Sequence, residues 1–285
     1  MKIRKAVIPA AGFGTRFLPL TKSMPKEMLP IINKPVIHYV VEEAVRSGIK
    51  DILIITATGK RAIEDYFDHN ADLEQHLGKN NKNKELNEIN IFADDVYIHF
   101  IRQKEQKGLG HAVSLAKKFV GNEPFVVLLG DDIIKSKKHA TKQMMDVFEE
   151  KQATIIGVEE VPKERIEKYG VIDGEKLKEN LYLIKSLVEK PKLKDAPSNI
   201  GIIGRYILMP QIFECLEKIK PGAGGELQLT DALVLLQKTQ EMYAFVFDGK
   251  RYDTGNPEGW LKTNIEYAMD DECLREKLKL KELLE

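Results

Sequence analysis

KAVIPAAGFGTRFLPLTKSMPKEMLP, residues 5–30, is the stretch around which the rest of the chain is most simply explained. It opens with an apolar run at 6–8 that has no polar alternation, which predicts a buried strand. Small residues follow directly, and they let the backbone approach a ligand and direct its N–H groups at anionic oxygens. Arg16 and Lys26 add positive charge. The combination predicts a phosphate site whose small residues are Ala10, Ala11, Gly12 and Gly14.

Two other glycine-rich sites can be tested on the same residues. A dinucleotide-binding turn needs a third glycine, but Phe17 stands there, and Leu18-Pro19 disfavours an immediate helix. The next strand also ends without an acidic residue. A P-loop needs a Gly-Lys-Ser/Thr ending, which is missing. These patterns argue against NAD and P-loop chemistry and leave, beside the anion site, a tight turn with solvated charges as the alternative.

Composition restricts the class of protein. The 285 residues carry 44 Lys and Arg against 44 Asp and Glu, so no overall field attracts nucleic acid or an anionic membrane. No run of 18 apolar residues predicts a membrane span. Cys215 and Cys273 are isolated, and the histidines lack metal spacing, which predicts neither a disulfide framework nor a zinc site. The first strand leaves no room for a signal peptide, so we expect a cytoplasmic protein.

Periodicity predicts alternating strands and helices. In the first part of the chain we expect strands at 51–56, 96–102, 125–129 and 153–158, with helices at 36–46, 60–67, 71–77, 110–120 and 141–150. The polar run 78–88 reads as a solvated surface excursion. Further on we expect a β meander at 169–174 and 181–189, strands at 200–208 and 243–247, and helices at 210–219, 232–239, 257–269 and 272–284, with Thr230-Asp231 capping the helix at 232–239. The fold class is therefore α/β, with one doubly wound, mixed sheet and added β elements.

A family resemblance rests on two motifs. Ala10-Ala11-Gly12-x-Gly14-Thr15-Arg16, followed by Pro25-Lys26-Glu27-Met28-Leu29-Pro30, resembles the signature of the sugar-1-phosphate nucleotidyltransferases. The Lys-Glu-Met-Leu-Pro form is similar to their uridylyltransferase branch, as is a helical insert that begins near 68–74. The resemblance runs from residue 6 to residue 255 and implies a Rossmann-like, glycosyltransferase-A-like fold. We expect a single domain over 1–285, with 1–130 mainly for nucleotide, 131–255 mainly for sugar phosphate, and helices at 256–285.

The resemblance also implies a reaction. UTP and glucose 1-phosphate would give UDP-glucose and pyrophosphate by Mg²⁺-dependent, in-line attack on the α-phosphate. Such a transfer needs positioning and charge neutralisation more than a protein nucleophile. The family assigns catalytic roles to Arg16, Lys26 and Lys190. It implies nucleotide binding by Ala10, Ala11, Gly12, Gly14, Thr15, Glu27, Gln103 and Gly108.

The remaining site residues follow strand ends. Asp131 ends a buried strand, where such sheets bind ligands. The family match places the metal on Asp131, with Asp253 either completing the site or binding through water. Gln103 could accept a hydrogen bond from uracil N3–H and donate one to O4. The resemblance implies that the sugar phosphate is held by Asp132, Gly170, Glu189 and Lys190.

Three alternatives stay open on sequence alone. Gln103 and Gly108 do not separate uracil from thymine, so a thymidylyltransferase of the same fold remains. A non-catalytic subunit that senses sugar nucleotides would have the same fold, although the full charged set argues against it. The sequence does not encode which sugar is used, and it leaves a homodimer or a homotetramer equally possible. The segment 225–231 also matches the family near the sugar pocket, but a helix cap is its simpler explanation.

Overall fold

The structure is a computed structural model that describes residues 1–90, 92, 96–222 and 225–279. Within this part, one nine-stranded mixed sheet has the order β5-β4-β1-β6-β11-β8-β12-β10-β9. Its parallel half consists of β5 (Tyr97–Arg102), β4 (Asp51–Thr56), β1 (Lys5–Pro9) and β6 (Phe125–Leu128). The other half contains β11 (Ile200–Leu208), β8 (Thr154–Glu160), β12 (Met242–Val246), β10 (Leu181–Glu189) and β9 (Gly170–Lys178).

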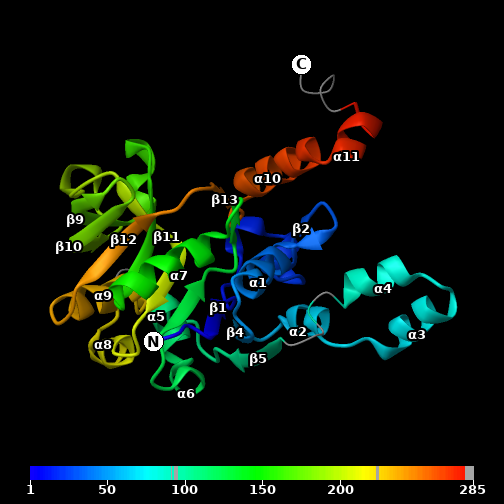
Figure 1. Cartoon of the computed structure of the whole chain (residues 1–285), viewed down its shortest axis with the longest axis horizontal. Helices are drawn as coiled ribbons and strands as arrows, with labels where there is room; N and C mark the ends of the chain where they lie inside the picture. Colours follow the sequence, from blue (N-terminus) through cyan, green and yellow to red (C-terminus); the bar gives the residue numbers. More distant parts are fainter. Residues whose placement is uncertain (91, 93–95, 223–224, 280–285) are drawn as a thin grey trace.

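Helices cover both faces of the sheet (Figure 1). Side chains alternate along β1, so Ala6 and Ile8 pack into one core and Val7 into the other. The first core is closed by α1 (Val36–Arg46) and α7 (Ala140–Lys151). The second is closed by α5 (Leu109–Ser114), α8 (Ile212–Lys218) and α9 (Leu229–Gln237). The expected α/β fold with one mixed sheet is therefore confirmed.

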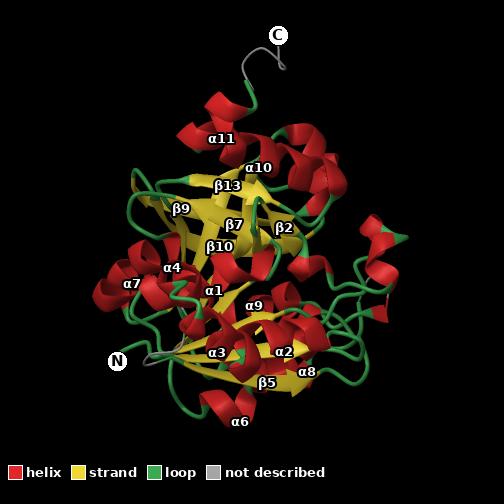
Figure 2. Cartoon of the chain, turned by 90° about the vertical axis from the view of Figure 1, so that its right-hand side faces the viewer, coloured by secondary structure: helices red, strands yellow, loops and turns green. Residues whose placement is uncertain are grey.

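Short elements connect the sheet to the C-terminal helices. The hairpin of β2 (Pro30–Ile31) and β3 (Lys34–Pro35) contacts α10 (Pro257–Asp270), where Trp260 Nε1 donates to the Pro30 carbonyl at 2.9 Å. A separate pair, β7 (Asp132–Lys135) with β13 (Lys250–Asp253), lies beside α10 (Figure 2). Three 3₁₀ turns, Thr15–Phe17, Leu20–Lys22 and Lys26–Met28, follow β1.

Several boundaries differ from the expectation. The helix expected at 110–120 is two, α5 and α6 (Lys117–Val120), because the N–H groups of Leu115 and Ala116 bond three residues back. The last helix, α11 (Glu272–Lys277), ends earlier than 284, and residues 280–285 lie outside the described part. Thr230-Asp231 is not a cap: α9 begins at Leu229, with Gln228 in the capping position, so that both residues lie inside its first turn.

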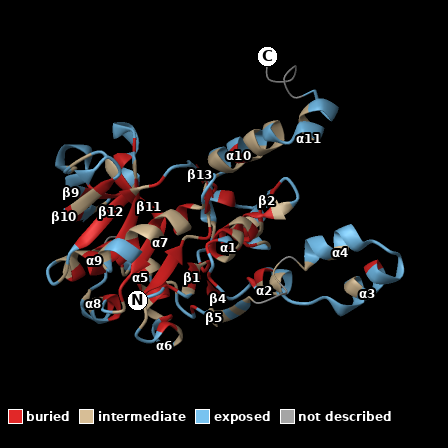
Figure 3. Cartoon of the chain, viewed as in Figure 1, coloured by how far each residue is buried: buried red, intermediate tan, exposed pale blue. Residues whose placement is uncertain are grey.

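The excursion after β4 is helical. It comprises α2 (Arg61–Phe67), α3 (Ala71–Lys79) and α4 (Asn83–Ile89). The polar run 78–88 thus contains a helix, and α4 buries no residue, as expected of a solvated surface segment (Figure 3). In the described part of the chain, no helix combines the length and apolarity needed to cross a membrane.

Candidate active site

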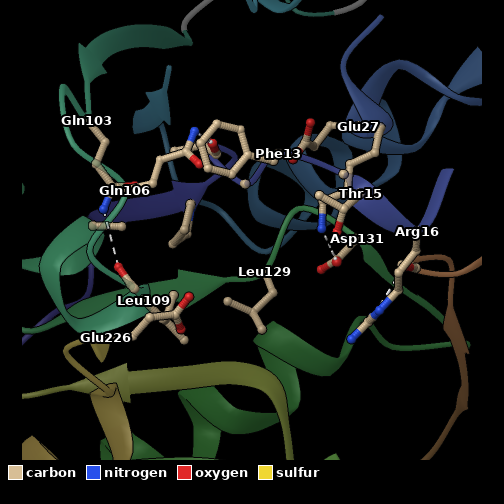
Figure 4. A pocket seen from close by; sticks show the side chains of 18 residues that line it. Phe13, Thr15, Arg16, Glu27, Gln103, Gln106, Leu109, Leu129, Asp131 and Glu226 are labelled. Carbon is tan, nitrogen blue, oxygen red and sulfur yellow. Dashed lines mark hydrogen bonds and ion pairs between the residues drawn. The ribbon is translucent and has the colours of Figure 1, made fainter. Parts of the chain in front are cut away.

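A cavity of about 500 Å³ lies where β1, β5 and β6 end (Figure 4). The carboxyl ends of parallel strands meet at one edge, which is where such sheets bind ligands. Figure 4 shows Gln103 and Gln106 on one side, with Arg16 and Asp131 on the other. The cavity brings together all but one of the residues predicted to bind nucleotide: Ala11, Gly12, Gly14, Thr15, Glu27, Gln103 and Gly108. It is also lined by two residues predicted to be catalytic, Arg16 and Lys26, and by one predicted metal ligand, Asp131. Ala10 does not line it; this residue is buried, and its N–H donates to the Ile55 carbonyl at 2.8 Å.

One wall of the cavity presents an amide and a glycine. Gln103 is 4% exposed, and its Nε2 donates to the Gly108 carbonyl at 3.2 Å and lies 2.9 Å from His111 Nδ1. Nε2 thus contacts the protein on two sides, and Oε1 is the atom that can meet a ligand. At Gly108, φ is +92° and an added Cβ would lie 2.8 Å from the Leu227 carbonyl oxygen, which requires glycine.

Sequence reasoning missed Gln106 and underrated Glu226, which both line the cavity. Gln106 Nε2 donates to the Ala11 carbonyl at 2.7 Å and so connects this wall to the glycine-rich loop 10–15 that follows β1. The buried Oε1 of Gln106 has no hydrogen-bond partner. Glu226 packs against Gly108: a Cβ added to Gly108 would lie 2.8 Å from the Cβ of Glu226. The family match over 225–231 was the sequence signal that could have identified Glu226. No sequence pattern pointed to Gln106.

Opposite this wall lies an ion pair. Lys26 Nζ is 2.6 Å from Asp131 Oδ2, and Arg16 Nη1 donates to the Gly255 carbonyl at 3.3 Å. Burial alone would lower the pKa of Lys26, but Asp131 outweighs it and raises that pKa. Burial would likewise raise the pKa of Asp131, whereas Lys26 holds it below its usual value. Both groups are therefore charged at neutral pH.

Glu27 lies on the cavity wall, but its carboxylate forms an ion pair with Lys60. Its Oε2 is 2.7 Å from Lys60 Nζ, and both side chains are buried. Burial raises the pKa of Glu27 and lowers that of Lys60, so the pair is costly to desolvate and depends on its short contact. Sequence reasoning missed Lys60, although its place four residues after β4 was an available signal.

Asp132 is turned away from the cavity. It is 4% exposed, and its Oδ1 accepts from Arg251 Nε and lies 2.8 Å from both Nε and Nη2. Burial raises the pKa of Asp132 to about 6; Arg251 opposes the rise and Asp131 adds to it. The carboxylate predicted to meet a sugar hydroxyl is thus already paired, with an arginine that sequence reasoning did not single out.

The other predicted sugar-phosphate residues lie together. Gly170 faces Glu189 across the β9–β10 ladder, and a Cβ on Gly170 would lie 3.1 Å from Glu189 Oε2. Thr230 donates to that oxygen at 2.7 Å, which draws α9 to the ladder. Lys190 Nζ, half exposed, is 3.4 Å from Glu189 Oε1. These residues form a polar group outside the lining of the large cavity.

The two predicted metal ligands converge on a glycine. An added Cβ on Gly255 would lie 2.7 Å from Asp131 Oδ2 and 3.2 Å from Asp253 Oδ1. Asp131 Oδ2 is paired with Lys26, and Asp253 Oδ1 accepts from the Gly255 N–H at 3.0 Å. Carboxylate oxygens are also the ligands that a hard cation takes. Among the described residues, no three His, Cys, Asp or Glu side chains form a complete cage. The pair therefore fits a metal that takes its other ligands from phosphate or water.

The chain is similar to known proteins over nearly its whole length. The chain matches the family model described as nucleotidyl transferase over residues 5–269. It is 53% identical to the UTP–glucose-1-phosphate uridylyltransferase of Staphylococcus epidermidis over 278 residues, which is 98% of this chain and 96% of that protein. A crystal structure of UDP-glucose pyrophosphorylase complexed with UDP-glucose is 46% identical, with a TM-score of 0.87 over 94% of this chain and 99% of that one. A UTP-bound UGPase from Acinetobacter baumannii is 38% identical, with a TM-score of 0.90 over 99% of each chain.

Proposed function

The chain belongs to the nucleotidyl transferase family, and from this premise we propose that it is an enzyme that joins UTP to glucose 1-phosphate, forming UDP-glucose and pyrophosphate. One observation carries the proposal. A single cavity has an amide and glycine wall at one end, suited to a base, and the Lys26–Asp131 pair with Arg16 at the other, suited to a triphosphate. Its 500 Å³ is in the range of small-molecule sites.

The reaction forms one bond and breaks one. A phosphate oxygen of glucose 1-phosphate attacks the α-phosphorus of UTP, and the bond to the β-phosphate breaks as pyrophosphate leaves. Lys26 and Arg16 neutralise the charge that develops, and the N–H groups of the loop 11–15 bind triphosphate oxygens. Gln103 Oε1 accepts from uracil N3–H, with Gly108 beneath the base.

The polar group on β9 and β10 binds the second substrate. Lys190 is half exposed and follows Glu189, so it can reach the sugar phosphate, while Glu189 and Gly170 meet the sugar hydroxyls. Asp132, paired with Arg251, supports this group instead of contacting the sugar. The proposal thus keeps two halves in one domain: residues 1–130 for nucleotide and 131–255 for sugar phosphate, with the C-terminal segment from residue 256 beyond them.

Asp131 and Asp253 would hold Mg²⁺, which would neutralise charge on the phosphate oxygens. Removing divalent metal with EDTA should abolish pyrophosphate release, and Mg²⁺ in excess should restore it.

We also propose that the sheet is doubly wound and Rossmann-like, which the order β5-β4-β1-β6 and the helices on both faces support. A cytoplasmic location and assembly as a homodimer or homotetramer complete the proposal.

The test compares nucleotides. Purified protein is given glucose 1-phosphate with UTP or with dTTP, and pyrophosphate release is followed, with a control that lacks the sugar phosphate. We expect rapid release with UTP and much slower release with dTTP. Equal or faster release with dTTP would favour the thymidylyltransferase alternative. Binding of UDP-glucose without any turnover would favour a sensor.

A further inference from the structure

Arg251 lies between the two halves of the proposed site and takes part in neither directly. It belongs to β13, which pairs with β7 beside Asp131, and its side chain is 10% exposed. Nε and Nη2 both lie 2.8 Å from Asp132 Oδ1, and Nη1 lies 2.7 Å from Glu159 Oε1. One largely covered guanidinium thus contacts an acid on β7 and an acid on β8.

The same guanidinium reaches the sugar-phosphate half. Nη1 also lies 3.3 Å from the Tyr169 hydroxyl, and the guanidinium carbon lies 5.4 Å from the centre of the Tyr169 ring. Tyr169 directly precedes Gly170, and its carbonyl accepts from the Lys190 N–H at 3.0 Å. A chain of short contacts therefore runs from Asp132, next to Asp131, through Arg251 and Tyr169 to Lys190.

Arginine has the chemistry that this position needs. Its planar fork bonds two carboxylates and a hydroxyl at once and stacks on an aromatic ring, whereas the single ammonium of lysine cannot span all of them. The positive charge also offsets the repulsion between neighbouring Asp131 and Asp132. The contacts fix where Tyr169 lies relative to the strand end at Asp131.

We propose that Arg251 is a positioning residue for the sugar phosphate, and that it sets the spacing between Asp131 in the nucleotide cavity and Lys190. The inference rests on the proposed function, since it assumes that Lys190 meets the second substrate. Small displacements of a reacting group reduce rate steeply. The nucleotide cavity is not lined by Arg251, so nucleotide binding should not depend on it.

The test separates the two substrates. In Arg251→Gln, the KM for glucose 1-phosphate should rise about tenfold and kcat should fall by at least as much, while UTP binding measured by calorimetry stays within twofold. Arg251→Lys should recover part of the loss, because it restores one ion pair. Arg46→Gln is the matched control: this arginine also pairs with an acid, Glu42, but is exposed on α1, and its replacement should leave both substrates unaffected.

A second variant avoids an unpaired buried acid. Tyr169→Phe removes only the hydroxyl contact, and it should raise the KM for glucose 1-phosphate about threefold without changing UTP binding. A folded Arg251→Gln enzyme with an unchanged KM for glucose 1-phosphate, or equal losses for both substrates, would overturn the proposal. Wild-type protein that makes no UDP-glucose would instead disprove the proposed function, so the two failures are distinguishable.

Discussion

Lys26 stays protonated although its burial disfavours the charged form. Its side chain is 20% exposed, and the short contact with Asp131 compensates for the loss of water. The fold therefore holds the positive charge that the proposed triphosphate site needs. The sequence motif predicted this lysine, whereas its partner, 105 residues further on, became visible only in the fold.

Lys26→Ala should reduce turnover by about 100-fold or more, because it removes a cation aimed at the developing charge. The fold should persist, as judged by far-ultraviolet circular dichroism, although Asp131 loses its partner. Steady-state pyrophosphate release measures the effect. A variant with the wild-type rate would exclude the assigned role.

Lys190 combines a side chain that we propose to bind the sugar phosphate with a strained backbone. Its φ of +44° lies in the left-handed region, which costs a residue other than glycine about 1 kcal/mol or more. Lys190→Gly should therefore relieve strain and unfold at the same or a higher urea concentration, yet lose most of its turnover. Lys190→Ala should lose turnover without the gain in stability.

Lys192→Ala is the control for both Lys190 variants, because that lysine is exposed two residues away and should retain the wild-type rate. If Lys190→Gly were to keep its activity, the backbone and not the charge would be what the site requires. If Lys192→Ala were equally impaired, the effect would be one of local charge only.

At the scale of elements, α1 is the clearest success of the sequence. Pro35 and Ser47-Gly48 predicted its limits, and the structure has Val36–Arg46. Local signals failed at α9, where Thr230 is drawn into the first turn by its bond to Glu189, 41 residues earlier. A distant partner thus outweighed the usual preference of threonine for a helix cap.

α1 also carries a buried histidine. His38 is 1% exposed; Tyr66 Oη lies 2.9 Å from its Nδ1, and its Nε2 has no hydrogen-bond partner. Burial, with Lys34 adding to the effect, lowers the pKa of His38 to about 4. The unfolded chain takes up this proton near its ordinary pKa of about 6.5, before the folded protein does, so stability falls as the pH drops from 6.5 towards 4.

His38→Gln should remove this part of the pH dependence. Urea unfolding at several pH values would show wild type losing up to about 3 kcal/mol more than the variant between pH 6.5 and 4. Above pH 7 the two stability curves should run parallel, since the histidine is neutral in both states. Parallel curves over the whole range would show that the ring does not titrate as described.

At the scale of the whole molecule, one buried ion pair connects four elements. Arg205 on β11 is 0% exposed, its Nη2 lies 2.7 Å from Glu43 Oε2 on α1, and it donates to the Asp132 carbonyl at 2.8 Å. Glu43 also accepts from the Thr141 hydroxyl on α7 at 2.6 Å. Burial alone would raise the pKa of Glu43, but Arg205 and Thr141 hold it below its usual value. The pair thus supports the backbone at Asp132, next to Asp131.

Arg205→Met should destabilise the protein by about 3–5 kcal/mol, because Glu43 is left buried and unpaired. The double variant that also has Glu43→Met should recover much of the loss, as both charges are then gone. Urea unfolding measures each. Arg61→Met is the control: its pair with Asp65 is exposed at both ends (83% and 60%), and its loss should cost less than about 1 kcal/mol. A loss below 1 kcal/mol in Arg205→Met would contradict the role of the pair.

The sequence by itself determined most of the strands and helices, the phosphate loop, and the gathering of Arg16, Lys26, Gln103 and Asp131 at one sheet edge. These features depend on local periodicity and on strand ends, which neighbouring residues encode. Only the tertiary structure decided which polar groups pair. Asp132 meets Arg251, 119 residues away, and Glu27 meets Lys60. A buried charge takes whichever partner the fold brings within reach, and no local pattern encodes that distance.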